Sequence, residues 1–317
     1  MDTAPVVVLS LLALVLAGPV PAALARARWP LHSPRAALAL WQSIAAAAVL
    51  SAFGAGLAIA SRLLVPDTSG RPTTRPTAEI AVIGLPLWTV YVVVLALTLV
   101  IGARLLLTLV RVAVRTRRLR ERHRDLVDLL DTVHVPELWG RAADLRVLTA
   151  AEPMAYCLPG LRSRVVVSDA TLTSLEPEEL RAVLAHERAH LRARHDLVLE
   201  AFLVLHTAFP RGVRSRSALR AVRLLVELLA DDSAVRRAGP KPLARALVVC
   251  AGGGAPSGAL AAGGPDTLAR VQRLAQPCGP RRATATAAYL LSVAILVAPT
   301  LAVAVPWLTE ISRVVGR

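Results

Sequence analysis

Four long stretches of the chain carry no charged residue: residues 3–25, 36–61, 80–103 and 283–309. An α-helix needs about 20 mostly apolar residues to cross the hydrocarbon core of a bilayer, and each stretch is long enough. The pattern of apolar and polar positions therefore predicts an integral membrane protein with four transmembrane helices.

The first apolar stretch could instead be a secretory signal peptide, because Ala22–Ala25 resembles a small-residue cleavage site. A signal peptide begins with basic residues, whereas this chain begins Met1-Asp2-Thr3. The acidic start favours a helix that stays in the mature protein.

The region between the third and fourth stretches, residues 112–282, mixes helical and strand periodicity. Its strongest patterns predict helices at residues 126–133, 177–193 and 218–237, and strands at residues 145–149 and 164–168. Leu197–Phe209 is apolar but too short to span, which is typical of a core or interfacial helix. The Gly/Ala-rich residues 248–264 favour a flexible connection, with an apolar hairpin against the bilayer as the alternative.

The composition agrees with a membrane protein. Hydrophobic residues make up 55% of the chain and the mean hydropathy is +0.55, which excludes an ordinary soluble domain. The net charge of +15 is explained by arginine in cytoplasmic loops rather than by nucleic-acid binding, since only 3% of residues are aromatic and could stack on bases.

The arginines also predict the orientation of the chain. They cluster after the first span, after the third and before the fourth, which all lie on one side of a four-span topology. The densest run is Arg111, Arg115, Arg117, Arg118, Arg120, Arg122 and Arg124. On the other side, Arg62, Arg71 and Arg75 are outnumbered. The positive-inside rule therefore places residues 112–282 in the cytoplasm of a multi-pass plasma-membrane protein, and the basic run could also touch anionic lipid.

The helix predicted at residues 177–193 contains the sequence His186-Glu187-Arg188-Ala189-His190. Two histidines four residues apart project from one face of a helix and can bind one metal ion. Glu187 lies about 100° around the helix from His186, close enough to reach a water molecule on that metal. The alternative is an exposed charged helix with two solvated histidines.

A third ligand would distinguish these interpretations, because zinc in a hydrolytic site takes three protein ligands and leaves one position open. Glu227 lies on the second apolar helix, and Asp231 lies one turn further along the same face. This E-x-x-x-D pattern is that of a glutamate zincin, in which the glutamate binds the ion and the aspartate orients a histidine ligand. Asp232 breaks the four-residue spacing. The alternative is an ordinary amphipathic helix that ends in acidic residues.

Residues 185–196 read A-H-E-x-x-H-L-x-x-R-x-D, and residues 227–234 read E-L-L-A-D-x-x-A. These motifs resemble the BlaR/MecR antirepressor family of integral-membrane zinc metallopeptidases. They are more distantly similar to membrane peptidases of the HtpX and CAAX-prenyl-protease types. Residues 155–160 and 165–168 look like the strand pair before the family's catalytic helix, and residues 270–274 look like the short helix before its last span.

The resemblance covers residues 1 to about 305 and implies a fold. The fold is an α-helical integral membrane protein with an α+β zincin-like (gluzincin) metallopeptidase domain at residues 112–282. This domain is inserted between the third and fourth transmembrane helices, and residues 310–317 form a short tail. An extended substrate could pair with the strand at residues 164–168 or with that around Ala155 and present its carbonyl to the metal.

The implied active site binds Zn²⁺ through His186, His190 and Glu227. Glu187 is the general base, and Asp231 hydrogen-bonds a histidine ligand. Asp196 matches the family's aspartate after the H-E-x-x-H, and both an orienting and a helix-terminating role are open. The candidates for an oxyanion partner are His195, His206 and Arg237, and none is assigned.

In the family, a membrane signal activates the cytoplasmic protease, which inactivates a BlaI-type repressor. The resemblance thus implies a zinc metalloendopeptidase that cleaves a cytoplasmic transcriptional repressor in signal transduction. Only Glu310–Arg317 follow Thr309, without an S-x-x-K motif, so we expect a short form without the penicillin-binding sensor domain. The alternatives are an HtpX-type quality-control protease and a non-catalytic membrane receptor or scaffold, against which the intact Glu187 argues.

The cysteines add little to this site. Cys157, Cys250 and Cys278 are irregularly spaced and form no C-x-x-C, which argues against a disulfide framework. Cys157 lies near the predicted site and is expected to be a buried neutral thiol.

Overall fold

The structure is a computed structural model, and it describes residues 3–66, 72–73, 75–131, 144–209, 216–252, 260–261, 266–276, 279 and 282–315. Within these residues, four helices are long and apolar enough to cross a membrane: Ala4–Arg26, Pro34–Leu63, Leu85–Leu130 and Arg282–Ala302. Each overlaps one of the four uncharged stretches of the sequence. The prediction of a mostly helical chain with four candidate spans is therefore confirmed by length and composition.

The first two candidate spans are built from consecutive short and long helices. They are α1 (Ala4–Ala17), α2 (Pro19–Arg26), the 3-10 helix η1 (Trp29–Leu31), α3 (Pro34–Ala60) and the 3-10 helix η2 (Ser61–Leu63). α1 and α2 meet at Gly18 because Pro19 suits the first turn of a helix but has no N–H to continue one.

The third candidate span is preceded by a sharp break. The helices α4 (Pro76–Ile83) and α5 (Leu85–Leu130) meet at Gly84, whose φ of +85° is a conformation that glycine adopts without strain. The span predicted at residues 80–103 therefore begins in α4 and crosses this break. α5 then runs for 46 residues, so a single helix continues from the apolar stretch into the arginine run.

The remaining elements near the membrane are short or terminal. α12 (Arg282–Val315) continues past Thr309, so the tail predicted at residues 310–317 is helical as far as Val315. The strands β1 (Val65–Pro66) and β2 (Pro72–Thr73) form an antiparallel pair before α4.

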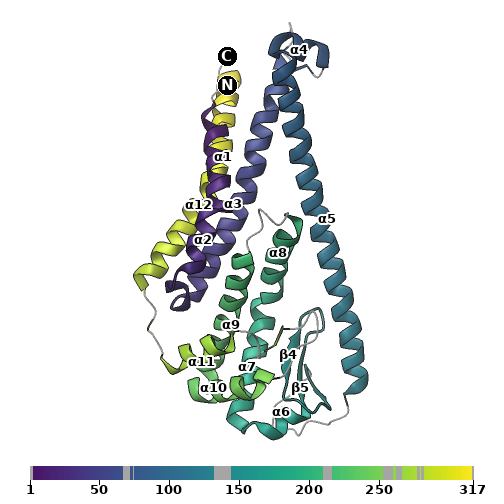
Figure 1. Ribbon diagram of the computed structural model, residues 1–317, viewed down its shortest axis with the longest axis vertical. Coiled ribbons are helices and arrows are strands. Elements are labelled where there is room, and N and C mark those ends of the chain that lie inside the picture. The colour runs from purple at the N-terminus through teal and green to yellow at the C-terminus, as the bar shows by residue number, and fades with distance from the viewer. Residues whose placement is uncertain are drawn as a thin grey trace.

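The candidate spans pack around α3. α1 and α12 lie along α3, and both marked ends of the chain lie at the same end of the bundle, as an even number of spans requires (Figure 1). α5 meets α3 through small residues: a Cβ on Gly56 would overlap Thr98, and Gly102 lies against Phe53. Small residues at such crossings let two membrane helices approach closely. Towards the α+β domain α3 and α5 separate, and the helix α8 (His195–Ala208) lies between them (Figure 1).

The α+β domain contains a small sheet with strand order β3-β5-β4-β6. Its strands are β3 (Leu145–Leu148), β4 (Ala155–Leu158), β5 (Arg164–Ser168) and β6 (Leu260–Ala261). β5 is parallel to β3 and antiparallel to β4, while β6 is antiparallel to β4. Both edges of β5 are therefore used, and the expectation that a substrate could pair with residues 164–168 is wrong.

Helices pack on this sheet and on one another. They are α6 (Asp169–Ser174), α7 (Pro177–Ala193), α8, α9 (Arg216–Ala238), α10 (Pro240–Val249), the 3-10 helix η4 (Cys250–Gly252) and α11 (Thr267–Ala275). α7 begins with a capping box between Glu176 and Glu179 around Pro177 and ends at Arg194, which is left-handed with φ +50°. This turn starts α8 immediately and folds it back beside α7.

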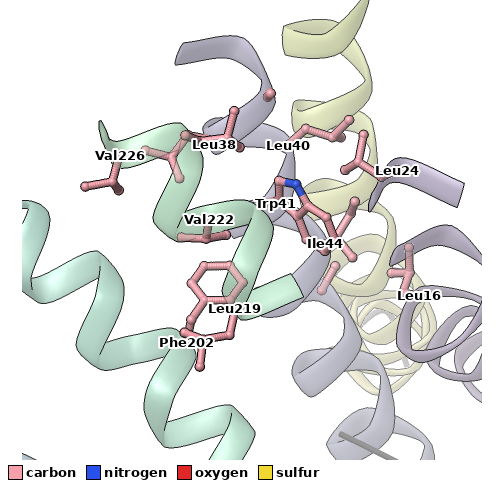
Figure 2. Packing of buried hydrophobic residues seen from close by; sticks show 13 residues of the cluster. Leu16, Leu24, Leu38, Leu40, Trp41, Ile44, Phe202, Leu219, Val222 and Val226 are labelled. Carbon is pink, nitrogen blue, oxygen red and sulfur yellow. The ribbon is translucent and has the colours of Figure 1, made fainter. Parts of the chain in front are cut away.

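Two hydrophobic clusters position α7 and α9. The first joins the sheet to α7 through Val165, Val167 and Cys157 with Val183 and Leu184. The second joins the candidate spans to the domain: Trp41 and Ile44 of α3 pack with Leu219 and Val222 of α9 and with Phe202 of α8 (Figure 2). One face of α9 therefore lies directly on a candidate membrane helix.

Several predictions from the sequence fall partly outside the described residues. The helix predicted at residues 126–133 is the end of α5 as far as Leu130, and residues 132–143 lie outside. The predicted connection at residues 248–264 is described only where α10, η4 and β6 cover it. Cys278 and residues 67–71 and 74 also lie outside.

Trp41 provides a test of the packing between α3 and α9. Its side chain is 2% exposed, so Trp41→Ala should leave a cavity and lower the free energy of unfolding by about 3–5 kcal/mol. Thermal unfolding in detergent measures the change. Leu50→Ala on the same helix is the control, because Leu50 is 49% exposed and its loss should cost no more than about 0.5 kcal/mol. Equal stability of the two variants would contradict this packing.

Candidate metal centre

The helices α7 and α9 bring His186, His190 and Glu227 together. One potential ligand atom from each residue lies within 4.8 Å of the other two. The Nε2 atoms of His186 and His190 are 3.1 Å apart, and they lie 3.4 Å and 3.6 Å from the two carboxylate oxygens of Glu227. The i and i+4 spacing on α7 produces the first contact, and only the packing of α9 against α7 produces the other two.

These separations fit a small divalent ion. Two ligand atoms about 2.1 Å from an ion with tetrahedral coordination lie about 3.4 Å from each other, close to the 3.1–3.6 Å observed. Two imidazoles and a carboxylate are also a donor set that zinc takes in hydrolytic sites. The three residues can therefore hold a metal ion without rearrangement of their helices.

The outer nitrogens of both histidines are held by other side chains. Nδ1 of His186 lies 3.0 Å from Oδ1 of Asp231, the contact that the sequence predicts for Asp231. Nδ1 of His190 lies 3.0 Å from Nδ1 of His195, the first residue of α8. A proton on Nδ1 of each imidazole would leave the lone pair of each Nε2 free, on the side where Glu227 lies.

Burial and charge shift the pKa values of these imidazoles in opposite directions. Burial alone would lower the pKa of His186, but the carboxylates of Asp231 and Glu227 outweigh it and raise the pKa to about 9. For His190 burial dominates and lowers the pKa to about 3, and burial lowers that of His195 to about 4. The carboxylates thus favour positive charge beside His186, which a bound divalent cation would supply in place of a second ring proton, while His190 stays neutral.

Glu187 lies beside this cluster in an unusual environment. Its side chain is fully buried, and no N–H or O–H group of the described residues reaches either carboxylate oxygen. Burial raises its pKa to about 7, against the smaller opposite effect of His186. The buried thiol of Cys157 on β4 lies next to it, and burial raises the pKa of that thiol well above its usual range. A carboxyl group with a pKa near 7 can both accept and release a proton at neutral pH.

A guanidinium group from a distant segment completes the cluster. Arg270 on α11 donates to both oxygens of Asp231, at 2.8 Å from Nε and 2.6 Å from Nη2, and its Nη1 lies 3.0 Å from Oε2 of Glu227. Burial would raise the pKa of both acids, but Arg270 and the histidines outweigh it and lower the pKa of Asp231 and of Glu227.

The structure pairs Asp196 with two arginines. Its carboxylate pairs with Arg120 of α5 at 3.3 Å and with Arg194 at 3.4 Å, and Arg120 also pairs with Glu200 at 2.7 Å. Asp196 therefore ties the first turn of α8 to α5. Among the candidates for an oxyanion partner, His195 faces the outer nitrogen of His190, and Arg237 is exposed near the end of α9.

The sequence pattern did not identify the roles of Arg270 and His195. A signal for Arg270 was present: it lies one turn before Leu274 on the buried face of α11, where an isolated arginine needs an acidic partner. His195 directly follows the end of α7, and only the left-handed turn at Arg194 directs it back to His190.

The chain matches one known protein family. The model of Peptidase family M48 matches residues 115–277, which is more than half of the chain and includes every residue of the cluster described above. No curated protein and no solved structure matches the chain.

His195 provides a test of the outer contact to His190. His195→Ala removes the partner of His190 Nδ1, and loss of such a partner typically weakens metal binding about 10- to 100-fold. Competition with a chromophoric chelator measures the affinity for Zn²⁺. The control is His206→Ala on the same helix, which should leave the affinity unchanged. If His195→Ala also binds Zn²⁺ like the unmodified protein, His195 does not orient His190.

Proposed function

Because this chain belongs to peptidase family M48, a family of metallopeptidases, we propose that it is a membrane-embedded zinc metalloendopeptidase. The observation that carries the proposal is the convergence of His186, His190 and Glu227 with the buried carboxyl group of Glu187 beside them. Metal-assisted hydrolysis of a peptide bond uses a Lewis acid and a base within reach of one water molecule. His186, His190 and Glu227 would hold the metal ion, and Glu187 would supply the base.

In this proposal, Nε2 of His186, Nε2 of His190 and a carboxylate oxygen of Glu227 bind Zn²⁺. The bound ion supplies Lewis acidity, which polarises a peptide carbonyl and lowers the pKa of water. Asp231 and His195 keep the two imidazoles in the tautomer that presents Nε2. Asp196 has a different role: it fixes α8, and with it His195, to α5 through Arg120.

Glu187 acts as the general base and then as the acid. It takes a proton from the attacking water and passes it to the nitrogen of the leaving amine. A pKa of about 7 suits both steps. At neutral pH a large fraction of Glu187 is the carboxylate, which can accept a proton, and the protonated form is acidic enough to donate it.

The substrate strand is proposed to lie along β4. β4 packs against α7 and carries Cys157, whose thiol neighbours Glu187. An extended peptide at this edge would present its carbonyl groups towards the histidine pair. β6 pairs with β4 at Tyr156 and Cys157, so such a peptide would replace Leu260–Ala261.

We further propose that the four apolar helices make this a multi-pass protein of the plasma membrane, with the bilayer as a partner and residues 112–282 in the cytoplasm. The arginine run on α5 supports this orientation by the positive-inside rule.

The proposed substrate is a cytoplasmic transcriptional repressor of BlaI type, which the protease would inactivate in response to a signal. The motifs shared with the BlaR/MecR antirepressor family support this assignment. The second candidate is quality control of membrane proteins, as in proteases of the HtpX type. It is favoured by the packing of Trp41 on α9, which puts the site close to a candidate membrane helix.

Substitution of the base tests the catalytic proposal. Glu187→Gln should keep Zn²⁺ bound and lower kcat by at least about 10²- to 10⁴-fold, the usual contribution of a general base. Metal analysis and cleavage of a peptide library by the purified protein measure both quantities. The control is Glu178→Gln on the same helix, since the side chain of Glu178 is 70% exposed. Retained proteolysis by Glu187→Gln would remove Glu187 as the base.

The same variant separates the two candidate substrates in cells. Intact proteomes with the unmodified and the Glu187→Gln protein are compared. One cytoplasmic repressor that accumulates only with Glu187→Gln would support the antirepressor function. Accumulation of many membrane proteins would instead support quality control.

A topology reporter tests the orientation. A reporter protein that works only in the cytoplasm is fused after Gly160. We expect this fusion to be active, because residues 112–282 are proposed to lie in the cytoplasm. Activity of a reporter that works only outside the cytoplasm would overturn the orientation and leave the catalytic proposal untouched.

A further inference from the structure

Arg270 is one of the most buried charged residues in the described part of the chain. It belongs to the short helix α11, which precedes α12, and its side chain is 1% exposed. Burial of an unpaired arginine is costly. Its position is explained by the two carboxylates that it reaches, one of which belongs to the proposed zinc site.

The guanidinium group bridges two acids that lie one helical turn apart on α9. Nε and Nη2 donate to the two oxygens of Asp231, and Nη1 lies 3.0 Å from Oε2 of Glu227. Oδ1 of Asp231 is also the atom that lies 3.0 Å from Nδ1 of His186. One side chain thus contacts both the carboxylate proposed to bind the metal and the carboxylate that orients a histidine ligand.

We propose that Arg270 is a positioning residue of the zinc site, acting through Glu227 and Asp231 rather than on the substrate. The inference rests on the proposed function, because it assumes that Glu227 binds the ion. Arg270 donates to both oxygens of Asp231 and pairs with Oε2 of Glu227 at 3.0 Å, so it holds the Asp231 carboxylate and favours one position of the Glu227 carboxylate. The site is therefore arranged before the ion arrives.

The charge balance of the cluster supports this role. Glu187, Glu227 and Asp231 are three carboxyl groups in one buried cluster, and Arg270 is the guanidinium group that contacts two of them. Arg270 therefore supplies positive charge beside two carboxylates that lie one helical turn apart on α9. Without Arg270, Glu227 and Asp231 would repel each other at short range in a medium of low dielectric constant.

The fold holds Arg270 in place from both sides of α11. Leu274 and Val271 pack in one hydrophobic cluster with Ala182 and Ala185 of α7. Arg273 donates to Asp232 of α9 at 2.7 Å and to the backbone oxygen of Leu31 in η1 at 2.8 Å. α11 is therefore fixed to the helix that carries Glu227 and to the segment between the first two candidate spans.

Two substitutions at Arg270, made in the full-length protein in detergent, test the proposal. Arg270→Gln removes the charge, and we expect its Zn²⁺ affinity to fall about 10- to 100-fold, as for other residues that orient metal ligands. Arg270→Lys keeps a positive charge but replaces the planar fork with a single ammonium group that cannot bridge both acids. We expect it to fold and to lose about 10-fold in affinity. Competition with a chromophoric chelator gives the affinities.

Arg273→Gln is the matched control. Arg273 lies on the same helix and also pairs with an acid of α9, but that acid is Asp232, not one of the residues around the histidines. If Arg270 had a merely structural role, the Arg270 variants and Arg273→Gln would all lose thermal stability, and none of them would change its Zn²⁺ affinity. A positioning role predicts weaker Zn²⁺ binding for the Arg270 variants alone.

The outcomes separate this inference from the proposed function. If the unmodified protein binds no Zn²⁺, or if His186→Ala leaves binding unchanged, the proposed function fails. If the unmodified protein binds Zn²⁺ at this site and Arg270→Lys binds it equally well, the role of Arg270 is overturned and the proposed function stands. Should Arg270→Gln fail to fold, Arg270→Lys alone decides.

Discussion

A buried cluster of charges between α7 and α9 is the constraint that the rest of the domain satisfies. Glu187 and Asp231 are almost completely inaccessible to water, as are His186 and His190. Ionised groups in such a place are stable only when they are paired or bind a cation. Asp231 has His186 and Arg270 as partners, whereas no N–H or O–H group of the described residues reaches Glu187. This difference makes Asp231 suited to hold other groups and Glu187 suited to move a proton.

α9 connects this cluster to the candidate membrane helices. One of its faces carries Glu227 and Asp231, and another packs Val222 and Val226 in the cluster that contains Trp41. α5 makes a second connection, since Arg120 pairs with Asp196 and His123 lies 2.9 Å from the hydroxyl group of Tyr156 on β4. Both the ligand-bearing helix and the strand beside Glu187 are thus attached to helices that are long and apolar enough to span a bilayer.

The family match and the geometry describe the same part of the chain at different levels of detail. Membership of peptidase family M48 gives a metallopeptidase, and the four apolar helices indicate association with a membrane. The metal, the substrate and the orientation are proposals that depend on particular residues: the donor set of α7 and α9, the motifs that resemble those of the antirepressor family, and the arginines of α5. Each can fail without the others, because each depends on a different part of the molecule.

The sequence by itself determined the features that depend on neighbours along the chain. The uncharged stretches set the candidate spans, and the i and i+4 spacing with the acidic first turn set α7 and its histidine pair. The E-x-x-x-D spacing on α9 also directed attention to Glu227 and Asp231. Only the tertiary structure decided which segments far apart in sequence meet. It placed β5 between β3 and β4 and paired Asp196 with Arg120. It also brought His195 to the outer nitrogen of His190, and Arg270 into contact with Glu227 and Asp231. These contacts arise from the packing of whole helices and from a single left-handed turn at Arg194, and no local periodicity in the sequence encodes them.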